Sequence, residues 1–153
     1  DMACGWGGAL RRMKESGNVL LTGDEKSELG ILVFDATTVP AAFVAEEGEL
    51  LAKFLKVTAD ANAMWADEAN QAKMLPVIAK DAGMDETATA ETLAGFVFPS
   101  VDEQLGAAWL GGGAQDFMGG VAKVFLDSGN IDAALDSYAG TVNTAPLMAV
   151  KGM

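Results

Sequence analysis

Residues 31–40 read Ile-Leu-Val-Phe-Asp-Ala-Thr-Thr-Val-Pro, and the predicted fold depends on this stretch. Ile31–Phe34 is an apolar run of strand length and is rich in β-forming residues, which predicts a buried strand. Pro40 suits the first turn of a helix. Beyond Pro40 the apolar residues recur with helical spacing, so the predicted strand separates two kinds of sequence.

Two more short strands are predicted upstream of this run, at Asp1–Trp6 and Val19–Thr22. An amphipathic helix near Leu10 separates them, so residues 1–30 have a strand–helix–strand pattern. This segment holds too little apolar surface to form a core alone, and we expect it to pair with polypeptide outside the chain. Because residue 1 already falls inside a predicted strand, we expect the sequence to be a fragment or a processed chain.

Downstream of Pro40 the sequence predicts a series of helices. The clearest of them begins at the acidic residues Glu47 and Glu49 and continues to Trp65, with apolar residues at intervals of three and four. Negative charge at its start complements the helix dipole. The predicted helices are, in chain order, residues 41–46, 47–65, 67–82, 86–94, 100–110, 117–126 and 132–138.

Several residues in this part are typical of helix ends. Gly83 is placed to stop one helix, and Asp85 to cap the start of the next. Ser100 and Glu103 have the spacing of a capping box. The run Gly111–Gly113 lacks the Lys-Ser/Thr that follows in a phosphate-binding loop, and it is interpreted as a flexible joint between helices.

Composition narrows the possible functions. The chain has 153 residues, 50% hydrophobic and 21% charged, which is typical of a globular domain. Its net charge of −12 disfavours nucleic-acid binding, because a basic patch is needed to neutralise phosphates. The absence of histidine rules out Ser-His-Asp and Cys-His arrangements within this chain. We therefore expect no catalytic residues, no metal site and no cofactor, and a protein that is not an enzyme.

Five segments, taken in order, resemble those of taurine-type solute receptors of ABC importers, within the type II periplasmic binding protein family. The first segment, Asp1–Leu10, resembles the family's Asp-x-Ala-x-x-Trp-x-Pro-Ala segment, although Gly8 stands where many relatives have proline. The third segment, Leu32–Asp35, resembles the strand that carries the chain back into the first lobe. The fourth, Pro40–Phe54, resembles the family's Phe-Ala-x-x-x-x-x-Leu-Leu-x-x-Phe helix. The fifth segment, Val124–Ala134, resembles the Phe-Leu-x-x-Gly-x-Ile-x-x-Ala motif near the end of the family's sequences. The segments are Asp1–Leu10, Gly17–Leu20, Leu32–Asp35, Pro40–Phe54 and Val124–Ala134.

The resemblance implies an α/β fold, namely the C-terminal half of a type II periplasmic binding protein, mostly helical with about three strands. Residues 1–30 would end the second α/β lobe. Residues 31–153 would supply the hinge strand and the helical C-terminal part of the first lobe. The implied function is to capture taurine, or a similar small sulfonate or amine-containing solute, between two lobes. The implied partners are this ligand, the ABC permease and a missing N-terminal half, and the implied location is the periplasm.

Two residues are the leading candidates for ligand contacts. Trp6 lies at the end of a predicted strand, where it is expected to form an aromatic wall against the ligand, or alternatively to pack in a core or lobe interface. Asp35 ends the apolar run, where its carboxylate is expected to bind the ligand's ammonium group. The alternative for Asp35 is a cap of the turn before Pro40.

Two weaker candidates adjoin them. Thr37 lies two residues beyond Asp35, on the same side of an extended chain, and otherwise has a structural role. Gly7 would let the backbone approach the ligand, or would serve only the strand-to-helix turn.

Two other functions remain open from the sequence. The same fold serves enzymes related to pyrimidine synthesis, and a non-transport enzyme is one alternative. The other is a mostly helical interaction domain that stands alone. That alternative predicts a monomer without a sheet and leaves the three predicted strands without partners.

Overall fold

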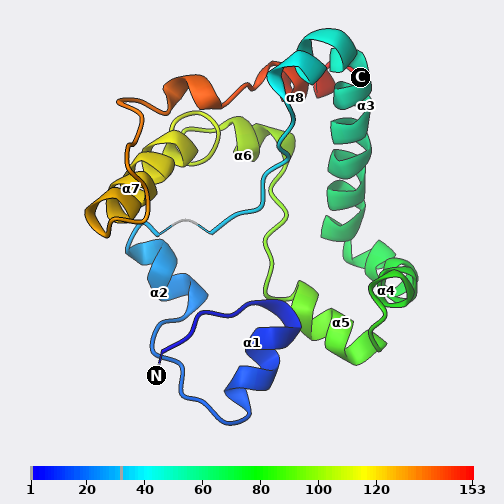
Figure 1. Ribbon diagram of the computed structural model, residues 1–153. Helices are drawn as coiled ribbons and strands as arrows, with labels where there is room; N and C mark the ends of the chain where they lie inside the picture. Colours follow the sequence, from blue (N-terminus) through cyan, green and yellow to red (C-terminus); the bar gives the residue numbers. More distant parts are fainter. Residues whose placement is uncertain (1, 32) are drawn as a thin grey trace. The chain divides into compact units, whose positions relative to one another are not determined.

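The computed structural model describes residues 2–31 and 33–153, and within these ranges every regular element is a helix (Figure 1). The prediction of an α/β fold with about three strands is therefore wrong: the described chain is all-α. Asp1 and Leu32, which belong to two of the predicted strands, lie outside the described residues. The elements are α1 (Gly7–Lys14), α2 (Gly23–Glu28), α3 (Ala41–Ala66), α4 (Glu68–Ala82), α5 (Glu86–Leu93), α6 (Val101–Leu105), α7 (Gly113–Asp127), the 3-10 turn η1 (Ala139–Thr141) and α8 (Ala145–Val150).

The segments predicted as strands are irregular in the structure. Leu20 and Leu21 lie in a bend, and the described part of residues 31–39 has no regular structure. Val33 is 69% exposed and Leu20 72% exposed. A strand is stable only when a neighbouring strand accepts and donates its backbone hydrogen bonds. The described chain contains no such neighbour, so an apolar, β-prone composition is not enough to form a strand here.

Helix α3 confirms the predicted pair of helices after Pro40. Its backbone is helical on both sides of Glu47, which itself has φ −125° and ψ 29° and kinks the helix. The break falls where the sequence placed the end of one helix and the acidic start of the next. Leu51 and Ala52, just beyond the kink, are among the buried residues.

The predicted caps around α4 and α5 are confirmed. Gly83 follows α4 in the left-handed conformation, with φ 64° and ψ 31°. The Asp85 side chain accepts a hydrogen bond from the backbone N–H of Ala88, at 2.8 Å, and starts α5. The bonds of the two caps join residues at most five apart, so the local sequence is sufficient to predict them.

The capping box at the start of α6 is also confirmed. The Glu103 carboxylate accepts from the Ser100 hydroxyl and the Ser100 backbone N–H, both at 2.7 Å. These two bonds, the hydroxyl bond first, lower the pKa of Glu103 from its usual 4.5. The helix itself is shorter than predicted, because α6 ends at Leu105 and not near Leu110.

By backbone contacts the described chain forms two units. The first comprises the residues up to Glu25 together with Ala61–Phe98, and in it α5 packs against both α4 and α1. An ion pair between Arg11 and Glu91, at 3.8 Å, links α1 to α5. The predicted domain division at residue 30 is not the same as this one and stays a prediction.

The second unit comprises Lys26–Asp60 and Pro99–Met153. In it α8 packs against α6, and η1 against α7. The Phe34 ring makes edge-on contacts with Trp109 and Phe117, with both centroid distances at 6.1 Å. Phe34 therefore anchors the irregular segment before Pro40 to the start of α7.

The buried apolar core is small. Most of its members are alanine, and its other members are Leu51, Leu147 and Val150. Many large apolar side chains are exposed instead, which is unusual for a protein that has no partner for its apolar surface. No helix in the described part of the chain is long and apolar enough to span a membrane.

Candidate functional site

Trp6 and Gly7 stand at the start of α1. Trp6 is the N-cap residue of this helix, in extended conformation, and its side chain is 72% exposed. Gly7 has φ +54°, a value that side chains disfavour, and a Cβ there would lie 3.5 Å from Thr92 Cγ2. Gly7 thus serves the turn into the helix, and the Trp6 ring is available to a ligand because it does not pack in a core.

Asp35 and Thr37 belong to the irregular segment that follows Phe34. Both are exposed, and neither side chain makes a hydrogen bond or an ion pair with the described residues. The turn cap that was the alternative role for Asp35 is therefore not formed in the described structure. Trp6 and Gly7 fall in one unit and Asp35 and Thr37 in the other, so the structure describes each pair separately.

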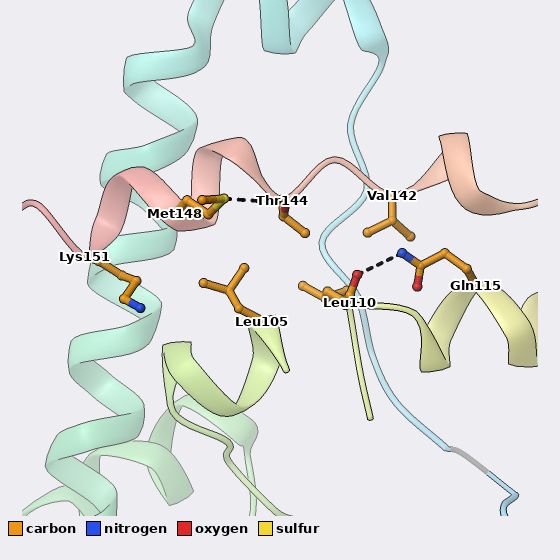
Figure 2. Close-up of a pocket in the computed structure, with 8 residues that line it drawn as sticks. Leu105, Leu110, Gln115, Val142, Thr144, Met148 and Lys151 are labelled. Atoms are coloured by element: carbon orange, nitrogen blue, oxygen red, sulfur yellow. Dashed lines mark hydrogen bonds between the residues drawn. The ribbon is translucent and has the colours of Figure 1, made fainter. Parts of the chain in front are cut away.

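The second unit contains a cavity of about 420 Å³ that the sequence analysis did not find (Figure 2). It lies between α6, the turn after it, the start of α7 and α8. Its walls are mainly apolar, with one cationic side chain and two neutral polar ones. The lining residues are Leu105, Leu110, Gly111, Gln115, Val142, Thr144, Met148 and Lys151.

Three of these residues come from α8 and its two flanking residues, because Thr144 is the N-cap of α8 and Lys151 follows its last residue. Thr144, Met148 and Lys151 are spaced four and three residues apart, which places them on the same side of a helix. The Thr144 hydroxyl makes only a long contact with Met148 Sδ, at 3.8 Å. A sulfur acceptor is weak, so the Thr144 hydroxyl remains able to bind a ligand.

The opposite wall is rigid because the turn after α6 is tightly bonded. The backbone N–H of Leu110 donates to Gln104 O and that of Gly113 to Ala107 O, at 3.0 and 2.9 Å. A Cβ at Gly111 would lie 2.8 Å from the carbonyl oxygens of Leu105 and Gly106, so only glycine fits. Close backbone packing therefore explains Gly111 and Gly113, and a φ of +150° explains Gly112. The interpretation of Gly111–Gly113 as a flexible joint stays a prediction.

Gln115 extends this wall. Its Nε2 donates to the Leu110 carbonyl oxygen at 2.8 Å, as Figure 2 shows, and this bond orients the amide because a carbonyl oxygen only accepts. Gln115 Oε1 is buried and has no hydrogen-bond partner among the described residues. Such a group destabilises a fold by about 1–3 kcal/mol.

Lys151 carries the charge of the cavity. Its Nζ lies 2.5 Å from Asp102 Oδ1, and the two side chains are 53% and 77% exposed. Exposed pairs of this kind contribute little to stability because water and salt screen them. Asp102 is not among the lining residues, so the ammonium group is the one charge that the lining itself presents.

The first unit contains a second hollow, of about 380 Å³, beside α4 and α5. Gln71 Nε2 donates to the Trp65 carbonyl oxygen at 3.0 Å and fixes one side of it. Its lining has no ionisable side chain, so it offers shape but no charge for recognition. The lining residues are Trp65, Gln71, Ala72, Leu75, Ala90, Leu93 and Ala94.

The described residues contain no group of three or more His, Cys, Asp or Glu side chains placed to hold a metal ion. No protein-family model, no curated protein and no solved structure matches the chain.

Proposed function

We propose that the chain is part of the solute-binding component of an ABC importer, which captures taurine or a similar small sulfonate- or amine-containing solute between two lobes. The proposal rests on the ordered sequence resemblance and not on the fold, because the described chain has no sheet. Two structural observations support it: Trp6 is 72% exposed, and Asp35 is exposed and its side chain makes no hydrogen bond with the described residues. Both side chains are thus available to a ligand.

Each residue has a defined role in this proposal. The Asp35 carboxylate accepts a charge-assisted hydrogen bond from the solute's ammonium group. The Trp6 ring packs on the short carbon chain, with Gly7 allowing close approach and Thr37 adding a hydroxyl. The loaded receptor then delivers the solute to the membrane permease, in the periplasm, without changing it chemically.

The exposed apolar surface is consistent with a further polypeptide partner. Leu20, Leu29 and Val33 are each at least 65% exposed, and all three lie in the part of the chain before Pro40. Burying such side chains stabilises a protein by roughly 1.5–3 kcal/mol each. The proposed partner is the other half of the receptor, which would cover these residues and complete the site.

Calorimetry with two ligands tests the proposal on the full-length gene product. Taurine and ethanesulfonate differ only in the ammonium group. Asp35→Ala should weaken taurine binding about tenfold or more, since a charge-assisted bond is lost, and should leave ethanesulfonate binding unchanged. Asp24→Ala, at an exposed carboxylate in α2, is the matched control and should affect neither ligand. Equal taurine affinity of Asp35→Ala and the wild type would contradict the role of Asp35.

A stand-alone helical interaction domain is the second candidate, and the all-helical architecture favours it. It differs from the first in a measurable way. The full-length product would bind neither taurine nor ethanesulfonate, and it would be fully folded as a helical monomer. A taurine affinity in the micromolar range or better would exclude this candidate.

A further inference from the structure

We propose that the cavity between α6, α7 and α8 binds a small organic anion, with a carboxylate or sulfonate head and a short aliphatic body. Lys151 binds the head, and Leu105, Leu110 and Met148 cover the body. This site shares no residue with the solute site proposed above, and the inference does not depend on that function.

The composition of the cavity sets the ligand class. The lining presents the Lys151 ammonium group just after α8 and the Thr144 hydroxyl just before it, and both groups donate hydrogen bonds. The other walls are mainly aliphatic. A ligand that satisfies both parts has an anionic head and an apolar body. A purely apolar ligand would gain nothing from the ammonium group, which would stay paired with Asp102, and a cation would be repelled by it.

The present partner of Lys151 does not prevent anion binding. Asp102 is 77% exposed on its own side chain and lies outside the lining. Because an exposed ion pair is weak, a ligand anion competes with Asp102 for the same ammonium group. Asp102 is therefore a competitor of the ligand, and removing its charge should strengthen binding. A purely structural ion pair predicts no such gain.

The wall opposite α8 is held by hydrogen bonds within the described chain. The Gln115–Leu110 bond and the backbone bonds of the turn after α6 hold it, and Gly111 brings the backbone to the cavity surface. A pre-formed wall lowers the ordering cost of binding. The ligand then has to order little more than the Lys151 side chain.

The test is a titration of the chain with hexanoate, hexane-1-sulfonate and neutral hexanamide, followed by calorimetry and by the NMR shifts of the Met148 methyl group and the Thr144 amide. We expect both anions to bind and to move these signals, and hexanamide to bind at least about tenfold more weakly because it lacks the charge. Equal binding of hexanamide would overturn the proposal, as would anion binding that leaves both signals unmoved.

Two variants and a matched control complete the test. Lys151→Gln should weaken anion binding about tenfold, and Asp102→Asn should strengthen it about threefold. Lys123→Gln is the control, because Lys123 forms a similarly exposed pair with Asp127 at 2.9 Å, away from the cavity. Far-ultraviolet circular dichroism checks that each variant is folded. If Lys151→Gln is unfolded, the increase in anion affinity expected for Asp102→Asn still tests the proposal. An anion affinity of Asp102→Asn equal to that of the wild type overturns it.

The two proposals fail independently. Asp35→Ala and Trp6→Ala should leave hexanoate binding unchanged. Conversely, the loss of taurine affinity caused by Asp35→Ala should be the same with and without Lys151→Gln. Loss of hexanoate binding in the Asp35 and Trp6 variants would show that the anion occupies the solute site and not this cavity.

Discussion

At Gly83 the backbone has φ +64°, and a Cβ added there would have no heavy atom within 4 Å. The cost of Gly83→Ala is therefore purely the conformational cost of a left-handed residue. We expect this variant to lower the free energy of unfolding by about 1 kcal/mol. Equilibrium unfolding in urea, followed by circular dichroism, measures it.

Gly120→Ala is the opposite-sign control. Gly120 lies inside α7, also has open space around a new Cβ, and has no positive φ. Alanine there should raise the free energy of unfolding by roughly 0.5–1 kcal/mol, because glycine is a poor residue in a helix interior. If both variants shift stability in the same direction, the left-handed conformation at Gly83 is contradicted.

Single residues also show why the candidate site is only partly predictable. The exposure of Trp6 and the lack of a side-chain partner for Asp35 are results of the structure, since the sequence left both a structural and a ligand role open. The Lys151 cavity had one sequence signal, the spacing of Thr144, Met148 and Lys151. Because the sequence did not predict a helix from Thr144 onward, this spacing could not be interpreted as one face of a helix.

Among the elements, α6 should respond to acid at its first turn. The Ser100 bonds hold the pKa of Glu103 below its usual 4.5, so its carboxylate stabilises the folded helix start. A lowered folded-state pKa means that this stabilisation is complete above pH 4.5 and is lost as pH falls through the folded value. We expect the Ser100 amide signal to shift with this lowered pKa in an NMR titration.

Ser100→Ala is the comparison for that titration. Without the hydroxyl, the largest cause of the lowered pKa is gone, and the Glu103 pKa should return toward 4.5. Glu103→Gln should keep the cap, because an amide oxygen also accepts the bond, but should remove the pH dependence. A Glu103 pKa that is the same with and without Ser100 would contradict the capping box.

Elements differ in how far the sequence determines them. The cap at Asp85 and the kink at Glu47 were predicted because their hydrogen bonds and charges lie within one helical turn. The end of α6 was not, since the turn from residue 106 to 113 is closed by backbone bonds and by carbonyls that leave no room for a side chain at Gly111. Glycine runs have the same composition whether they are flexible or tightly packed.

For the whole molecule, the absence of a sheet in the described residues is the property to measure first. Amide hydrogen exchange on the isolated chain should show rapid exchange at Val33 through Val39, where the backbone makes no hydrogen bonds with other described residues. The amides near the buried Leu51 should exchange more slowly. An infrared amide I band for β-sheet, or protection at residues 33–39, would contradict the all-helical architecture.

The sequence alone determined the bounds of α3, α4 and α5 to within a residue or so and the caps at Gly83, Asp85 and Ser100, because helical hydrogen bonds join residues four apart and need nothing from elsewhere in the chain. It did not predict α2 and α8, and the helix that it predicted at residues 132–138 is wrong, since these residues are irregular. It also identified the apolar, β-prone stretches before Pro40. Only the tertiary structure decided that the described residues of these stretches are irregular, with Phe34 packed and Leu20 and Val33 exposed, since a strand is completed by a neighbour that the described chain does not contain. The cavity at Lys151 was likewise decided there, because its walls come from segments between Leu105 and Lys151 that no local pattern connects.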